Sequence, residues 1–169
     1  MIKKSFLVLA LIFLLMFFPS IIQAQTKSLF IPAYAFLKKK NEPIFGYEAG
    51  YIWLKETSPI TQALVAQVQL PEGAIISKIL IRYLDNGDSG LQLELYRRNM
   101  YNDKEQYLAQ FSSLGSDPSW RMGEDSSITF PKVSNSGYCY YLHLGMYGRG
   151  LDYRFAGIKI LYVEQQGGE

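Results

Sequence analysis

The side chains best suited to catalysis and metal binding are scarce in this sequence. It contains one histidine, His143, and one cysteine, Cys139. Both lie in an alternating segment, residues 137–146, where an expected β-strand points them to the same face. Four residues of strand separate them by roughly 13 Å, so they cannot form a thiolate–imidazole pair. We therefore expect His143 as an outward-facing sheet residue, while a site shared with carboxylates of other strands, or a disulfide of Cys139 between two copies, stays open.

Acidic residues gather at two places where oxygens could hold calcium. The first is Asp85, Asn86 and Asp88, but Gly87 stands where the EF-hand pattern needs an oxygen. Asp-Asn-Gly is a favoured hairpin turn, so we predict a turn here, with Asp85 and Asp88 as secondary calcium candidates. The second group is weaker still and lies in an expected loop: Asp117, Glu124 and Asp125. Zinc-ligand spacing is absent, and no metal or other cofactor is expected.

No arrangement of residues singles out an enzymatic reaction. The glycine-rich stretch 145–150 lies between two expected strands and opens no helix, so it is read as a turn rather than a phosphate cradle. Glycoside hydrolysis needs two carboxylates roughly 5–10 Å apart, and no pair stands out in the sequence. We predict a non-enzymatic protein, and a hydrolase acting on extracellular glycan ranks third among the hypotheses.

Tyrosine is unusually abundant, with 13 residues, joined by Trp53 and Trp120. Aromatic rings form rigid contact platforms in binding sites, although they also pair across the strands of ordinary sheets. Three of them fall in expected loops, where binding residues usually lie. The candidate ligand-binding residues are therefore Trp120, Tyr101 and Tyr147.

Short alternating segments recur along the chain after residue 25 and predict strands. Residues 74–84 are apolar on both parities, as in a central strand, and residues 28–36 contain Pro32, which suits an edge. Residues 113–127 are expected to be irregular. The predicted strands cover residues 28–36, 46–54, 62–70, 74–84, 91–96, 106–112, 128–130, 137–146 and 153–163.

This pattern predicts an all-β fold, a two-sheet antiparallel sandwich with jelly-roll or Greek-key connectivity and eight or nine strands. A closed barrel is the second choice. The strand order cannot be read from the sequence.

The first 24 residues have the features of an export signal. Lys3 and Lys4 precede an uncharged apolar run, residues 6–18, and Ala24 supplies a small residue for cleavage. The run is about 20 Å long as a helix, too short for a hydrocarbon core of roughly 30 Å. We expect a signal peptide at residues 1–24 and a single domain at residues 25–169, secreted or periplasmic and without a stable membrane anchor.

The net charge of the expected mature chain argues against nucleic acid as a partner. Lys3 and Lys4 leave with the signal, so 15 of the 17 basic residues remain, against 15 acidic ones. A chain of zero net charge has no basic field to hold a phosphate backbone. One cysteine and no glycosylation sequon favour a bacterial exported protein.

Several short segments of the sequence, taken in order, resemble those of a family of small exported bacterial β-sandwich domains of unassigned function. The resemblance implies the fold and the compartment and adds no catalytic residues. Cys139 before Tyr140 departs from it, since a small polar residue is usual at that position. The matching segments are residues 31–36, 70–74, 83–86, 95–97, 140–142 and 157–162.

Taken together, the sequence predicts an extracellular binding or surface-interaction module. Glycan binding through loop aromatics is slightly favoured, and contact with a protein, including self-assembly, is the alternative. The oligomeric state stays open.

Overall fold

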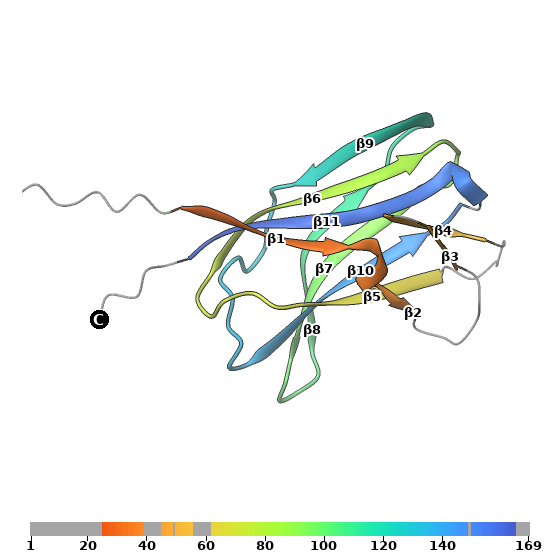
Figure 1. Cartoon of the computed structure of the whole chain (residues 1–169). Helices are drawn as coiled ribbons and strands as arrows, with labels where there is room; N and C mark the ends of the chain where they lie inside the picture. The colour runs from red at the N-terminus through yellow and green to blue at the C-terminus, as the bar shows by residue number, and fades with distance from the viewer. Residues whose placement is uncertain (1–24, 39–44, 49, 56–61, 149, 165–169) are drawn as a thin grey trace, which may run out of the picture.

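The computed structural model describes residues 25–38, 45–48, 50–55, 62–148 and 150–164. Two antiparallel sheets pack face to face (Figure 1), which confirms the expected all-β sandwich. Sheet A has the order β3-β4-β11-β6-β9, with β1 also paired to β11, and sheet B has the order β2-β5-β10-β7-β8. The described strands are β1 Thr26–Pro32, β2 Leu37–Lys38, β3 Phe45–Glu48, β4 Tyr51–Leu54, β5 Gln62–Val68, β6 Ile75–Asp85, β7 Leu91–Asn99, β8 Glu105–Ser112, β9 Asp117–Asp125, β10 Tyr138–Met146 and β11 Tyr153–Val163.

The chain passes repeatedly from one sheet to the other, as in a jelly roll. For example, β5 lies in sheet B, β6 in sheet A, β7 in sheet B and β9 again in sheet A. No pairing between the described strands joins the two sheets, so the second choice, a closed barrel, is not the architecture. Two 3₁₀ turns, Ala33–Ala35 and Gly150–Asp152, complete the described elements, and none of the described helices has the length and apolar character needed to cross a membrane.

Alternation along the strands decides which side chains enter the core between the sheets. In β7, Leu91, Leu93 and Leu95 are buried, and the residues between them are only half-buried on the outer face. The same alternation buries Leu142 and Leu144 of β10 against them. Each buried leucine contributes about 1.5–3 kcal/mol of hydrophobic stabilisation, which fixes the register and so the side chains on the outer face.

Several strand predictions are confirmed in place as well as in type. Strand β6 lies between β11 and β9, as its two apolar parities indicate, and β1 lies at an edge and ends at Pro32. The last predicted strand has the bounds of β11. The segment 85–90 connects β6 to β7 as a turn, with Gly90 at a φ of 85°.

Two segments differ from the sequence prediction. The expected loop 113–127 contains strand β9, which pairs with β6 at the edge of sheet A. Its inward positions are Arg121, Gly123 and Asp125, so apolar alternation is missing and the strand escaped detection. A ring from β8, Phe111, occupies the space over Gly123, where a Cβ atom would lie 2.0 Å from it.

The predicted strand at residues 128–130 is wrong. Thr129 instead bonds to the backbone oxygens of Tyr107 and Leu108, and the nearby pairing is an isolated bridge between Ile75 and Lys132. The predicted strand 46–54 is a hairpin of β3 and β4, so Tyr47 does not share a face with Tyr51 and Trp53. These changes and the two-residue β2 raise the count from eight or nine strands to eleven in the described residues.

Candidate functional site

The three predicted binding residues do not come together in one site. Trp120 lies in β9, on the outer face of sheet A, with 36% of its surface exposed. Tyr147 directly follows β10, and Tyr101 follows β7 at the opposite end of sheet B. The prediction that Trp120 lies in a loop is therefore wrong, and the two outer faces of the sandwich must be considered separately.

The outer face of sheet B, which we call the tyrosine face, carries Tyr96, Tyr107, Tyr141 and Tyr147. The register places Tyr141 of β10 opposite Tyr96 of β7, and Tyr96 opposite Tyr107 of β8. Tyr96 and Tyr141 stack with centroids 5.5 Å apart and an interplanar angle of 13°. Tyr107 meets Tyr96 edge-on at 5.8 Å. The three rings thus form one row across three strands.

The phenols of this row remain protonated at physiological pH. Burial, followed by the nearby carboxylate of Glu94, raises the pKa of Tyr96 to about 12. Burial, followed by a hydrogen bond with Glu105, raises the pKa of Tyr141 well above its usual value. A neutral phenol can donate a hydrogen bond as well as accept one, so the row offers both functions to a ligand.

A chain of polar contacts runs along the same face from the end of β10. The hydroxyl of Tyr147 donates to Oε1 of Gln92 at 2.6 Å, and Nε2 of Gln92 donates to Oε1 of Glu94 at 3.1 Å. The other oxygen of Glu94 lies 3.2 Å from Nδ1 of His143. Nε2 of His143 is buried and has no partner among the described residues. The carboxylate from another strand that the sequence left open for His143 is therefore Glu94.

The ring of Tyr147 packs over Gly145, which has no side chain. A Cβ atom at Gly145 would lie 3.2–3.3 Å from the ring and hydroxyl of Tyr147. The ring covers this backbone on one side and is 46% exposed overall. Its free side gives the tyrosine face an accessible aromatic platform beside the polar chain.

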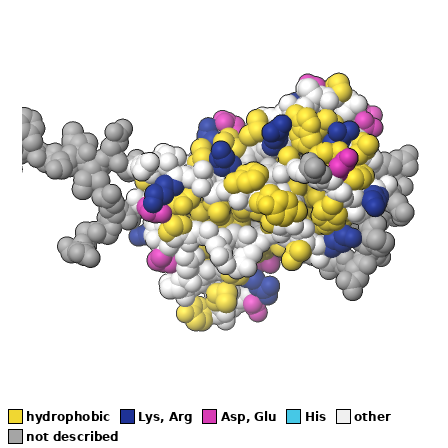
Figure 2. Space-filling view, in the orientation of Figure 1, with side chains coloured by type: hydrophobic (Ala, Val, Ile, Leu, Met, Phe, Trp, Pro, Cys, Tyr) yellow, Lys and Arg dark blue, Asp and Glu magenta, His cyan; other side chains and the backbone are white. Residues whose placement is uncertain are grey.

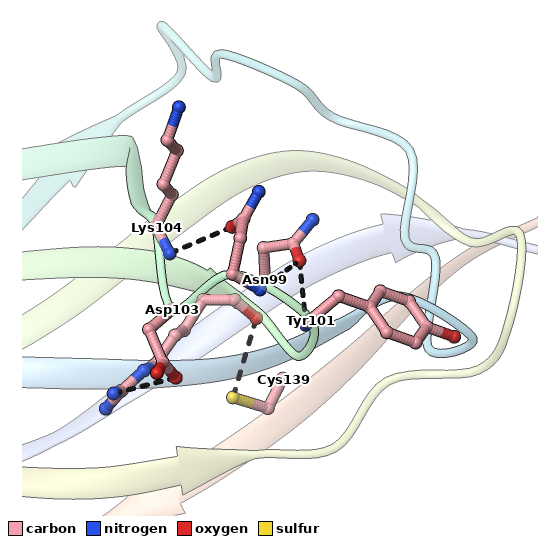
Figure 3. A network of polar contacts seen from close by, with 7 residues as sticks. Asn99, Tyr101, Asp103, Lys104 and Cys139 are labelled. Carbon is pink, nitrogen blue, oxygen red and sulfur yellow. Dashed lines mark hydrogen bonds and ion pairs between the residues drawn. The ribbon is translucent and has the colours of Figure 1, made fainter.

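Tyr101 lies in the tight turn between β7 and β8. Oδ1 of Asn99 accepts the backbone N–H groups of Tyr101 at 2.9 Å and Asn102 at 3.2 Å, which fixes the turn. Figure 3 shows the Tyr101 ring extending away from these contacts, and its hydroxyl donates to the backbone oxygen of Ser136 at 3.2 Å. With 83% of its surface exposed, Tyr101 lies beyond the end of the tyrosine face.

The outer face of sheet A carries a second group, the aromatic–arginine cluster of Tyr51, Trp53, Trp120, Arg82 and Arg154. Tyr51 lies 5.8 Å from Trp53 and 5.7 Å from Trp120 between ring centroids. Arg82 lies over Trp120 at 5.4 Å and Arg154 over Tyr51 at 5.2 Å. Figure 2 shows hydrophobic side chains together with Lys and Arg on the face that presents β9, β6 and β11.

Of the two calcium candidates, Asp85 is buried and hydrogen-bonded within the protein, and Asp88 is exposed. Asp85 is only 1% exposed, and its carboxylate accepts the hydroxyl of Ser113 and the backbone N–H of Gly87. The bond from Gly87 lies within the 85–90 turn, so Asp85 stabilises that turn. In the described part of the chain, no three His, Cys, Asp or Glu side chains gather closely enough to hold a metal ion.

The second acidic group is also bound to neighbours. Hydrogen bonds from the hydroxyl and backbone N–H of Ser119 hold the pKa of Asp117 below its usual value. Glu124 pairs with Lys78 at 3.0 Å. Asp125 accepts backbone N–H groups from Ser127 and Gln110. These carboxylates stabilise turns and the β9 edge.

Comparison with known proteins shows the fold. No family model and no curated protein matches this chain. Among solved structures, the xylan-binding module CBM15 superposes with a TM-score of 0.51 at 10% identity, over 85% of this chain and 100% of that module. The C-terminal CBM6 of LamC from Zobellia galactanivorans aligns with a TM-score of 0.47 at 15% identity, over 79% of this chain and 98% of that one. The first likeness supports the sandwich architecture.

Proposed function

We propose that the protein is a non-catalytic carbohydrate-binding module and that a glycan binds along the tyrosine face of sheet B. The observation that carries this proposal is the half-exposed ring of Tyr147 beside the polar chain of Gln92, Glu94 and His143. A sugar ring has an apolar C–H face and a rim of hydroxyl groups. The tyrosine face offers an aromatic surface for the first and hydrogen-bonding groups for the second.

The polar groups of the face are positioned before a ligand arrives. Gln92 is held between Tyr147 and Glu94, and Glu94 is held by His143. Held side chains lose less conformational entropy on binding, which favours affinity for a ligand with many hydroxyl groups. Strand β10 has nine residues, so the face is roughly 26 Å long, enough for a linear oligosaccharide of several units.

The likeness of the fold to a xylan-binding module supports a binding role. Because that likeness concerns the fold alone, the choice of face and ligand rests on the residues of this chain. The polar chain also contains a His–Glu pair, which could serve as an acid–base group, so a search for reaction products belongs in the test.

The test begins with a glycan array probed with residues 25–169, followed by calorimetry with xylohexaose, cellohexaose and laminarihexaose. Tyr147→Ala should abolish or strongly weaken binding, while the matched control Tyr34→Ala, an exposed tyrosine in the turn Ala33–Ala35, should not. Chromatography of the incubated oligosaccharides should show no shorter products. Equal affinities of the two variants would place the ligand elsewhere.

We also propose that residues 1–24 are a signal peptide and that the mature domain begins at Gln25, secreted or periplasmic. The support is the sequence: basic Lys3 and Lys4, a short apolar run and Ala24. Mass spectrometry of the exported protein should find Gln25 at its N-terminus. An intact Met1 on exported or membrane-retained protein contradicts this expectation.

A second candidate function, contact with another protein, is favoured by the aromatic–arginine cluster on sheet A. Trp, Tyr and Arg are the residues most enriched at interface hot spots, and the cluster is composed of these three types. The partner could be a second copy, so mass measurement in solution over a range of concentrations is the first test. A monomer at all concentrations removes self-assembly as the role of this face.

A further inference from the structure

A pocket lies at the end of the tyrosine face, between β5 and the start of β10. It has a volume of about 320 Å³, and Gln67, Gln69 and Cys139 are among its lining residues. Gln67 pairs with Tyr141 in the strand register, so the pocket begins where the tyrosine row ends. The next outward residue on β10, Cys139, lies about 7 Å further along the strand. The pocket and the tyrosine row are thus parts of one surface.

The lining of this pocket mixes polar, aromatic and aliphatic residues and carries no charge. Its lining includes Gln67, Gln69, Asn135 and Cys139, and none of the described residues that line it is acidic or basic. Amides both donate and accept hydrogen bonds, which suits hydroxyl groups rather than carboxylates, sulfates or phosphates. Ligand pockets measure roughly 300–1,000 Å³, so this one fits a small ligand such as one or two sugar rings.

Hydrogen bonds join the two chain segments at the end of the pocket that lies away from the tyrosine row. Nδ2 of Asn135 donates to the backbone oxygen of Leu70 at 2.9 Å, which joins the segment after β5 to the segment before β10. The backbone N–H of Asn135 also donates to the carboxylate of Glu72. A further backbone bond of 3.0 Å, from Gly73 to Val133, holds the same two segments together. These bonds bridge the end of the pocket that lies away from Tyr141.

We infer that this pocket is an end subsite: it takes the terminal sugar of a neutral glycan whose remaining units lie on the tyrosine face. The inference rests on the proposed function and adds two properties to it. The ligand is uncharged, and the protein recognises chain ends instead of the interior of a polysaccharide. The thiol of Cys139, which is labelled in Figure 3, lies 3.7 Å from the backbone oxygen of Arg98 in β7.

Cys139 is the only cysteine of the chain and gives the pocket a built-in probe. The experiment measures the rate of iodoacetamide alkylation of residues 25–169 by intact mass, with and without saturating xylohexaose, cellohexaose or laminarihexaose. A bound terminal sugar should slow alkylation of Cys139 at least tenfold. The matched control is the double variant Cys139→Ser, Met122→Cys, which moves the thiol to an exposed position on sheet A, and its alkylation should be unchanged.

The outcomes separate this inference from the proposed function. If a hexasaccharide binds by calorimetry but Cys139 reacts at its original rate, the end subsite is wrong and glycan binding stands. If the thiol at position 122 is protected instead, the ligand lies on sheet A and both assignments to sheet B fail. If neither the glycan array nor calorimetry with the three hexasaccharides shows binding, the proposed function fails and this inference fails with it.

Chain-end recognition has its own test with the polysaccharide that matches the hexasaccharide bound. Partial hydrolysis multiplies the chain ends of a fixed mass of polymer, so the amount of protein bound at saturation should rise in proportion. Binding that depends on the mass of polymer and not on the number of ends overturns the end subsite. Protein alkylated at Cys139 with N-ethylmaleimide should bind at least tenfold more weakly, and unchanged affinity counts equally against it.

Discussion

The two outer faces of the sandwich use aromatic residues in different ways. On sheet B, the tyrosines lie on the same face as Gln92, Glu94 and His143, and the hydroxyl of Tyr147 joins their chain of polar contacts. On sheet A, Trp53, Tyr51 and Trp120 contact one another and two arginines. The first arrangement can satisfy the hydroxyl groups of a sugar, whereas the second has the composition of a protein-contact surface. Aromatic content alone therefore does not identify the ligand.

The largest expected effect tests which face binds glycan. Tyr147→Ala removes the exposed platform and should weaken binding of the best hexasaccharide by about 30-fold, the effect of a hot-spot residue worth about 2 kcal/mol. The free energy of unfolding should change by no more than about 1 kcal/mol, because the ring is half exposed. Calorimetry and urea unfolding of the same protein measure both quantities.

Trp120→Ala provides the reciprocal measurement. It should leave hexasaccharide affinity within about twofold of wild type, because Trp120 lies on the other sheet. A 30-fold loss with Trp120→Ala and none with Tyr147→Ala reverses the assignment of the two faces.

The stability of Trp120→Ala distinguishes a core residue from a surface platform. Removing a buried aromatic costs about 3–5 kcal/mol, and Phe155, which is fully buried against Phe36, is the matched core control. Trp120 is 36% exposed and keeps contacts with Tyr51 and Arg82, so its removal should cost about 1–2 kcal/mol. Urea midpoints of both variants decide: equal losses would make Trp120 a core residue.

The sequence predicts the fold better than the site, for a physical reason. Leu91, Leu93 and Leu95 alternate visibly, and alternation is the signal that burial leaves in a strand. Strand β9 has no such signal because Arg121 and Gly123 occupy its inward positions and Phe111 fills the space. That is why the sequence placed Trp120 in a loop.

The sequence predicts which tyrosines point outward from each strand, but it does not predict that these strands lie side by side. The outward positions of residues 91–96 and 137–146 include Tyr96 and Tyr141, but nothing local shows that these two strands are neighbours. Pairing between β7 and β10 joins residues about 45 positions apart, and such register comes from the packing of the whole core. The sequence predicts Tyr147 as a binding residue because it falls in an expected loop. Its contact with Gln92 depends on the long-range pairing of β7 and β10 and cannot be predicted locally.

Alkaline titration sharpens the contrast between the faces through Tyr96. Its pKa of about 12 lies above the ordinary value of 10 because the folded protein buries the neutral phenol. In the unfolded chain the phenol loses its proton near pH 10, so the contribution of Tyr96 to stability is present below pH 10 and is lost as the pH rises toward 12. Tyr96→Phe should therefore make the stability fall less steeply between pH 10 and 12, as measured by urea unfolding at several pH values. The same slope in wild type and variant contradicts this assignment.

The smallest expected effect concerns Tyr101. Its side chain is 83% exposed, and its hydroxyl donates to the backbone oxygen of Ser136. The turn around it is fixed by Asn99 through backbone groups, which Tyr101→Ala retains. The variant should change the unfolding free energy by no more than about 0.5 kcal/mol. If the glycan ends in the pocket bridged by Asn135 and Leu70, as proposed, hexasaccharide affinity should also stay within about twofold. A tenfold loss in affinity would instead show that the glycan continues past the pocket and over the β7–β8 turn. Tyr101 therefore tests where the binding surface ends.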